Sequence, residues 1–415
     1  MRNRPLRVCH LGKYYPPAPG GMESHVRTLA QAQAALGVNV QVICVNHAGR
    51  DDGARAAVPF PTATLQEMDG LIPVTRVGRS SSVARLDICA DLPQVIRGLR
   101  NARLDILHVH TPNPAMLLAL ALLRRVPRLV ITHHSDIIKQ KLLRWALKPF
   151  EWAIYGKACK VLATSTAYAT GSPLLQRCQS RVEALPLGVE LAPYLRPSAS
   201  ALAYAAHLRA RHGWPIWLAV GRLVYYKGLH VALEALTRVP GTLLIIGTGP
   251  LQAQLRHRAN ELGVADRVVW EGYVSPEQLV GAYHAATAFW FPSNARSEGF
   301  GLVQVEAMAS GCPVINTTIP ASGVSFVSLH EKTGLTIPVN DSVALADAAH
   351  RLLSQPGLRD QLGGAALARA CQEFDHRTMA KRSLEIYQRA LAAELYPLAV
   401  SRSQHHTRAK RQAVG

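Results

Sequence analysis

Residues 297–308 read SEGFGLVQVEAM and place a glycine–phenylalanine–glycine turn in front of an apolar, helix-like run. We expect a helix over residues 301–310, because Gly311 is a typical C-terminal stop and Pro313 follows it. The two glycines leave the preceding backbone bare, so its N–H groups can approach a ligand at the positive end of the helix. The stretch therefore predicts a ligand-binding helix N-terminus. The alternative is a surface helix with an ordinary capping acid.

Two glutamates, Glu298 and Glu306, flank this turn eight residues apart. If the stretch were helical throughout, they would be separated by about 12 Å, at roughly 1.5 Å rise per residue. One carboxylate would then lie at the mouth of a site and the other two turns deeper. This spacing suits an extended ligand that carries an anion between two hydroxyl-bearing parts, as a nucleotide sugar does.

Short apolar runs typical of buried strands alternate with helical patterns on both sides of this stretch. We expect strands at residues 6–11, 38–45, 104–109, 129–132 and 161–164, and again at 216–220, 241–246, 267–270, 288–291 and 313–316. This alternation predicts parallel, doubly wound sheets, and 415 residues suit two such domains. A Pro/Ala/Ser-rich stretch before residue 200 divides the halves, so we predict domains at 1–187 and 188–375. Residues 51–70 are expected to form a loop, and residues 396–415 a disordered basic tail.

The cysteine content and the hydrophobic pattern indicate the cellular compartment of the protein. The seven cysteines are scattered and never form a CxxC pair, which argues for a reducing compartment and against disulfides or a zinc site. We see no signal-peptide pattern and no apolar run of membrane-spanning length. We therefore expect a cytoplasmic protein whose membrane contact, if it has any, is peripheral at the inner face of the membrane.

The net charge of +19 is concentrated in the first half of the chain. Residues 1–190 contain 24 Lys and Arg against 12 Asp and Glu. A basic half of this kind predicts an anionic partner: lipid headgroups, a pyrophosphate-linked acceptor or nucleic acid. The chain lacks the aromatic–basic signatures of RNA-binding modules, so we expect no nucleic-acid partner.

Ligands bind doubly wound sheets beyond the carboxyl ends of the strands, and several candidate residues stand at such positions. Arg222 and Lys227 follow the expected strand at 216–220, and two cations there could neutralise a diphosphate leaving group without a metal. A solvated basic loop is the alternative. Gly247 stands in a glycine turn after the next strand. Tyr273 follows another strand, and its side chain is as compatible with core packing as with ligand contact.

With these motifs assembled, the chain resembles retaining glycosyltransferases of the GT-B fold in family 4. The resemblance covers residues 6–395 and is carried by the Glu-x7-Glu stretch together with GRLVYYKG at 221–228 and IIGTGP at 245–250. It implies two Rossmann-like domains that face an interdomain cleft, with the acceptor bound by the first and the nucleotide sugar by the second. It also implies that a C-terminal helix, at residues 376–395, crosses back to the first domain.

The resemblance assigns roles to individual residues. Glu298 would face the donor sugar and Glu306 the ribose hydroxyls, while the backbone between them holds sugar and phosphate. Whether Glu298 is a nucleophile stays open, because such enzymes are usually described as reacting by front-face displacement. The catalytic residues we predict are Glu298, His133, Arg222 and Lys227. The predicted donor-binding residues are Gly20, Gly21, Arg222, Lys227, Gly247, Tyr273, Val274, Glu298, Gly299, Phe300, Gly301, Leu302 and Glu306.

The first half contributes fewer candidates. The bare amides of Gly20 and Gly21 open a helix and could meet the donor phosphate or the acceptor, although a simple turn is the alternative. The resemblance places His133 near the donor sugar. His108, His110 and His134 have no acidic or cysteine partners at ligand spacing, so we predict no metal site and no cofactor.

Residues 137–160 interleave lysines and arginines with aromatic side chains. This pattern suits contact with an anionic membrane as well as it suits a solvated helix face with a buried aromatic side.

The sequence thus predicts a metal-independent retaining transferase. It would move a hexose of mannose or glucose type from a nucleotide diphosphate sugar to a hydroxyl of a lipid-linked or polysaccharide acceptor in bacterial surface-glycan synthesis. GDP-mannose is the first candidate donor, followed by UDP-glucose or another UDP-hexose. A non-transferase GT-B enzyme, such as a nucleotide-sugar epimerase, is the alternative.

Overall fold

The computed structural model describes residues 4–47, 61–83, 86–99, 101–121, 123, 127–136 and 141–392. The predicted tail at 396–415 and the first ten residues of the predicted loop at 51–70 lie outside these ranges. Among the described residues, no helix is both long enough and apolar enough to cross a membrane.

The first domain is built on an eight-stranded sheet of order β10-β9-β8-β7-β1-β2-β4-β3. Seven strands are parallel and the edge strand β3 runs antiparallel to β4. The strands are β1 Arg7–Leu11, β2 Asn39–Val45, β3 Leu65–Asp69, β4 Ile72–Val77, β7 Ile106–Thr111, β8 Leu129–His133, β9 Lys160–Ala163 and β10 Val182–Ala184. A separate hairpin pairs β5 (Ser81–Val83) with β6 (Leu86–Ile88).

The second domain is built on a six-stranded parallel sheet of order β13-β12-β11-β14-β15-β16. Its strands are β11 Ile216–Val220, β12 Thr242–Ile246, β13 Val268–Gly272, β14 Ala288–Trp290, β15 Val314–Thr317 and β16 Gly334–Ile337. The strands are short and almost wholly apolar because helices cover both faces of the sheet. The predicted pair of doubly wound α/β domains is confirmed.

Helices connect the strands in both domains. In the first they are α1 Gly21–Ala35, α2 Leu92–Gly98, α3 Pro114–Ala121, α4 Lys141–Lys157, α5 Thr166–Gly171 and α6 Pro173–Gln176. In the second they are α7 Ala192–Leu195, α8 Ala199–His212, α9 Leu229–Leu236, α10 Gln252–Glu261, α11 Pro276–Ala285, α12 Leu302–Ala309, α13 Val324–Val327, α14 Ser342–Ser354 and α15 Leu358–Glu373. Short 3-10 turns lie at Gln179–Arg181, Tyr225–Lys227 and Ala265–Arg267.

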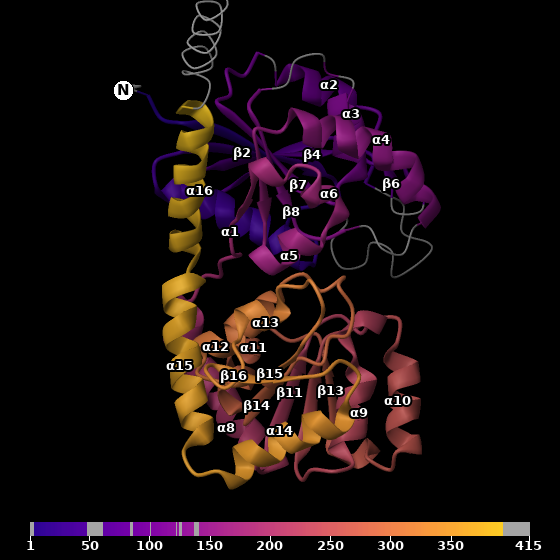
Figure 1. The fold of residues 1–415 in the computed structure, drawn as a ribbon, viewed down its shortest axis with the longest axis vertical. Coiled ribbons are helices and arrows are strands. Elements are labelled where there is room, and N and C mark those ends of the chain that lie inside the picture. The colour runs from indigo at the N-terminus through magenta and orange to yellow at the C-terminus, as the bar shows by residue number, and fades with distance from the viewer. Residues whose placement is uncertain are drawn as a thin grey trace, which may run out of the picture.

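The last described helix, α16 (His376–Ala392), returns to the first domain and packs against α1. Figure 1 shows the domains one above the other, with α15 beside the second and α16 beside the first. The chain thus crosses between the domains twice, and the two crossings are hydrogen-bonded. The N–H of Val189 donates to the carbonyl of Phe374 over 2.9 Å, and the N–H of His376 donates to the carbonyl of Val189 over 3.0 Å. The two segments that join the domains therefore lie side by side.

The expected loop at 51–70 is wrong where the structure describes it, because Leu65–Asp69 forms the edge strand β3. Four of its five side chains are exposed. An edge strand with so little burial lacks the apolar pattern by which sequence reveals a strand.

Candidate active site

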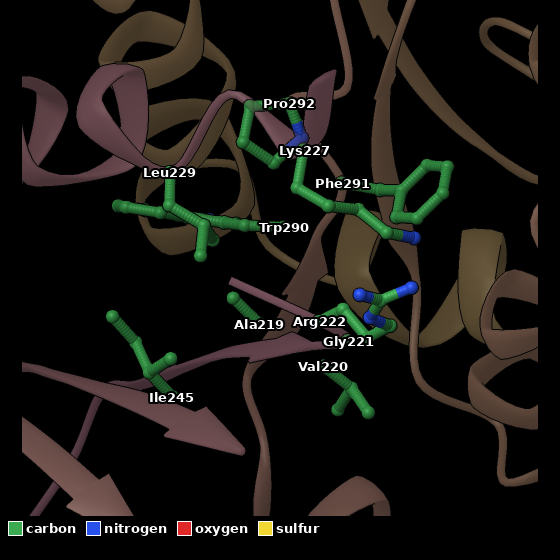
Figure 2. Close-up of a pocket in the computed structure, with 10 residues that line it drawn as sticks. All are labelled: Ala219, Val220, Gly221, Arg222, Lys227, Leu229, Ile245, Trp290, Phe291 and Pro292. Atoms are coloured by element: carbon green, nitrogen blue, oxygen red, sulfur yellow. The ribbon is translucent and has the colours of Figure 1, made fainter. Parts of the chain in front are cut away.

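Two cations line a pocket at the carboxyl end of β11. Gly221 ends this strand, and Arg222 and Lys227 line the pocket together with residues from β11, β12 and β14 (Figure 2). The loop returns at Gly228, whose φ of 64° suits glycine and whose Cβ would lie 2.0 Å from the carbonyl oxygen of Pro292. This close approach fixes the loop against β14 and places Lys227 at the pocket.

Lys227 forms an ion pair with Glu298. Its Nζ lies 2.6 Å from Oε2 of Glu298 and 4.7 Å from the centre of the Phe291 ring. Glu298 is 9% exposed, so its charge is neutralised mainly by this lysine. The structure therefore brings three of the four predicted catalytic residues to one place, because Arg222 lines the same pocket as Lys227.

The two glutamates do not share a helix. Helix α12 begins at Leu302 and contains Glu306, whereas Glu298 lies in the loop before it. The expected helix at 301–310 is present as α12, and the spacing of a continuous helix does not apply to the two glutamates because Glu298 precedes it. Gly301 adopts a left-handed φ of 81°, and a Cβ there would lie 2.6 Å from the Phe291 ring. This glycine turns the chain between the loop and the helix.

The glycine turn lies at the contact between the domains. The carbonyl of Gly299 accepts hydrogen bonds from the hydroxyl of Thr164, in the first domain, and from the N–H of Gly323. Leu302 faces the first domain as well, because a Cβ on Gly21 would lie 3.8 Å from its side chain. Phe300, in contrast, packs in the core of the second domain, so only its backbone faces outward to a ligand.

Glu306 projects from α12 toward α11. The hydroxyl of Tyr283 donates to its Oε2 over 2.8 Å. Burial raises the pKa of Glu306, while the bonds from Tyr283 and Tyr194 and the charge of Lys227 oppose that rise. Glu306 is therefore held between the hydroxyls of two tyrosines.

The remaining predictions in the second domain are placed at neighbouring strand ends. A Cβ on Gly247 would lie 2.1 Å from the carbonyl oxygen of Gly221, so the turns after β11 and β12 are in backbone contact. The side chain of Tyr273 is 57% exposed, which excludes the core-packing interpretation. Val274 is buried in the core, so it could meet a ligand only through its backbone.

His133 lies apart from these residues. It lines a second cavity, together with Asp136, Glu151 and Tyr155 of the first domain. The ring Nδ1 of His133 is 2.7 Å from the Tyr155 hydroxyl, and Nε2 is 3.3 Å from Oδ1 of Asp136. The structure therefore does not bring His133 into the pocket that Arg222 and Lys227 line.

Asp136 and Arg296, neither of which was among the predicted site residues, connect the domains. The Arg296 guanidinium is 2.8 Å from Oδ2 of Asp136 and lies over the Tyr168 ring. Burial works to raise the pKa of Asp136, but the bonds from His133 and Ser172 and the charge of Arg296 outweigh it and lower that pKa to about 2. Asp136 is therefore ionised at neutral pH. Sequence spacing could not reveal this pair, because its members lie 160 residues apart in different domains.

Comparison with known families decides the identity. The family model described as Glycosyltransferase Family 4 matches residues 19–192, and the one described as Glycosyl transferases group 1 matches residues 204–369. The chain belongs to this glycosyltransferase family. Both domains are matched, so the transferase assignment applies to the whole two-domain enzyme and the epimerase alternative is not favoured.

Relatives match over nearly their full length. The chain is 30% identical to the D-rhamnosyltransferase WbpZ of Pseudomonas aeruginosa, over 89% of this chain and 92% of the relative. It is 28% identical to the O-antigen chain mannosyltransferase C of Escherichia coli, over 92% of this chain and 98% of the relative. Each of these names describes a sugar transferase.

Solved structures share the architecture. The sucrose-phosphate synthase of Thermosynechococcus elongatus superposes with a TM-score of 0.74 at 25% identity, covering 94% of this chain and all of that one. The Anabaena protein Alr3699/HepE, solved with UDP and glucose, gives a TM-score of 0.71 at 20% identity over 92% of this chain and 98% of that one. The predicted GT-B fold of this glycosyltransferase is confirmed.

Proposed function

We propose that this glycosyltransferase transfers a hexose, with retention of anomeric configuration, from a nucleoside diphosphate sugar to a hydroxyl of a lipid-linked or polysaccharide acceptor in bacterial surface-glycan synthesis. The observation that carries the proposal is the largely buried ion pair between Lys227 and Glu298, 2.6 Å apart, beside a pocket that Lys227 and Arg222 line. A diphosphate entering this pocket would compete with Glu298 for Lys227.

The residues suggest a division of labour. Arg222 and Lys227 would neutralise the diphosphate as it leaves, which is the work a metal ion performs in other transferases. Glu298, released from Lys227, would face the donor sugar and stabilise the positive charge that develops at its anomeric carbon. In a front-face reaction the departing phosphate oxygen takes the proton of the acceptor hydroxyl. Closure of the domains at Gly299 would exclude water that could hydrolyse the donor.

Two relatives support a proposal about the donor sugar. Mannose and D-rhamnose, its 6-deoxy form, share one ring configuration, and the two relatives described above are named for transferring them. We therefore propose a manno-configured donor, with GDP-mannose first and UDP-glucose or another UDP-hexose as the alternative.

The test is to measure the binding of GDP, UDP, ADP and dTDP by thermal shift and by calorimetry, each with and without EDTA. Selective stabilisation by one diphosphate, unchanged by EDTA, supports a metal-independent donor site and identifies the base. An NMR assignment of the anomeric configuration of the product then tests retention. Absence of binding by all four diphosphates contradicts the proposed site.

Glu306 should make nucleotide binding depend on pH. Its raised pKa means that the carboxylate is lost as pH falls through a value above the ordinary one, so a hydroxyl acceptor is lost with it. We expect the affinity for the nucleotide to decrease from pH 7 toward pH 5. In Glu306→Gln the affinity should be lower at pH 7, by about 10-fold if one charge-assisted bond is lost, and should change less with pH than in the unmodified protein. Calorimetry across this range checks both statements. A pH response that is undiminished in Glu306→Gln would assign the response to another group, such as the terminal phosphate of the nucleotide.

We also propose that the basic face of the first domain contacts anionic membrane. Phe150 and Trp152 of α4 are 41% and 38% exposed, and Lys148 and Arg177 lie over the Trp152 ring at 5.0 and 4.0 Å from its centre. Exposed aromatics flanked by cations suit the headgroup region.

Neutralising two cations of this face should weaken membrane binding. Each is worth about 1 kcal/mol near an anionic surface, so Lys148→Gln/Arg177→Gln should reduce binding by about 30-fold. Sedimentation with phosphatidylglycerol-containing vesicles measures the binding. The control is Lys332→Gln, because Lys332 is exposed on the second domain. Equal binding of the double variant and the control would contradict membrane contact and favour the interpretation of α4 as a helix with a solvated basic face.

A further inference from the structure

Five histidines gather in the first domain between its sheet and the helices α1 and α16. His10, His108 and His110 come from β1 and β7, His134 follows β8, and His25 lies on α1. They form two triads that share His110, and within each triad one nitrogen per ring lies within 4.8 Å of the others. Spacing along the chain could not reveal this cluster, because His10 and His25 are separated from the rest by more than 80 residues.

The inner triad of His10, His108 and His110 is closed by hydrogen bonds. His108 contacts the hydroxyls of Tyr387 and Thr132 through its two nitrogens, and all three rings are fully buried. These nitrogens are already used, so this triad forms a structural network.

The same network fixes where the proton of each ring resides. Gln33 donates its amide to Ser383, so its carbonyl oxygen faces His10 and accepts from Nε2 over 2.8 Å. A neutral imidazole carries one N–H, and His10 donates it from Nε2 to Gln33, so its Nδ1 is a lone pair. This lone pair accepts from Nε2 of His110 over 3.0 Å. Nδ1 of His110 is therefore a lone pair directed toward the outer triad.

The outer triad of His25, His110 and His134 is open. Nδ1 of His110 and Nε2 of His134 are 3.3 Å apart, which is long for a hydrogen bond. Two imidazole nitrogens on one tetrahedral zinc ion, each about 2.0–2.1 Å from it, lie about 3.3–3.4 Å from one another. The separation therefore fits two ligands of one metal ion better than it fits a donor and an acceptor.

His25 supplies the independent observation. Its side chain is 1% exposed, and neither ring nitrogen has a hydrogen-bond partner among the residues that the structure describes. Its ring stands edge-on to His134 and His110, with centroids 4.9 and 5.4 Å away. A buried imidazole with both nitrogens unpaired is rare and needs a partner.

We propose that His25, His110 and His134 bind a divalent transition-metal ion, zinc above all. Three neutral imidazoles are a typical zinc ligand set, with the fourth position left to water. His10 accepts the N–H of His110, as second-shell partners of metal-bound histidines do. His134 is partly exposed and gives the ion a way in. The ion would hold α1 against the ends of β7 and β8. This proposal differs from the prediction that the chain has no metal site.

The test is titration of the metal-free full-length protein, purified with a histidine-free tag, with Co²⁺. We expect one Co²⁺ per chain, the visible absorption of tetrahedral cobalt, its displacement by Zn²⁺, and a raised Tm. These readouts do not involve nucleotide or activity, so their failure would leave the proposed transferase function untouched.

Variants assign the binding to the triad. Loss of a second-shell partner costs about 10–100-fold in metal affinity, so loss of a ligand should cost at least about 100-fold. We expect this loss of affinity in His25→Ala and in His134→Ala. His134 is partly exposed, so its replacement is less apt to disturb folding. His405→Ala/His406→Ala, which removes the adjacent histidines near the C-terminus, should bind as the unmodified chain does. Absence of Co²⁺ binding, or unchanged binding in both triad variants, overturns the proposal.

Discussion

Lys227→Ala is expected to lower kcat/KM for glycosyl transfer by about 1000-fold, the upper end of what loss of one oxyanion-stabilising group costs. Two losses combine in this variant. The diphosphate loses one of its two cations, and Glu298, whose Oε2 is 2.6 Å from Lys227, becomes a nearly buried carboxylate without its partner. The negative charge of Glu298 would then repel the diphosphate of the donor from the place where Lys227 had bound it.

A second variant separates the two losses. Adding Glu298→Gln to Lys227→Ala removes the repulsion, so the double variant should regain nucleotide affinity relative to Lys227→Ala while kcat stays low. Glu298→Gln alone should also reduce turnover by orders of magnitude. Steady-state kinetics and calorimetry with the nucleoside diphosphate measure the set, and exposed Lys332→Ala is the matched control. Near-normal turnover of Lys227→Ala would remove the lysine from the site.

The sequence revealed those parts of the fold that local pattern controls. Strands such as β11 and β12 are buried apolar runs that end in glycine turns, and their residues can be recognised without any partner. The exposed edge strand β3 carries no such pattern and was missed. The helix expected at 301–310 is present as α12, which begins at Leu302 after the left-handed turn at Gly301.

The site contacts that escaped prediction join residues that are distant in the chain. Lys227 and Glu298 could be inferred separately from strand-end positions, but their ion pair depends on how β11 and β14 lie side by side. Arg296 and Asp136 meet only when the domains do. No local spacing contains this information, since it arises from tertiary packing.

Gly299→Ala is expected to lower kcat by about 100-fold while the nucleoside diphosphate still binds the second domain. A Cβ on Gly299 would lie 2.6 Å from the backbone oxygen of His134, across the contact between the domains, and 3.4 Å from the Tyr168 ring. The carbonyl of His134 cannot move aside as a flexible side chain could, so the domains must separate slightly. A displacement approaching 1 Å between reacting groups is sufficient for a loss of about 100-fold.

The distinguishing signature of Gly299→Ala is a fall in kcat without a matching fall in nucleotide affinity, because the clash is with the first domain and not with the donor pocket. Small-angle scattering with bound nucleotide should show a more open enzyme than the unmodified chain. Gly364→Ala on α15, where a Cβ would meet nothing within 4 Å, is the matched control and should be neutral. If nucleotide affinity fell together with kcat, the substitution would be acting on the local turn. Domain closure would then not depend on the contact between Gly299 and His134.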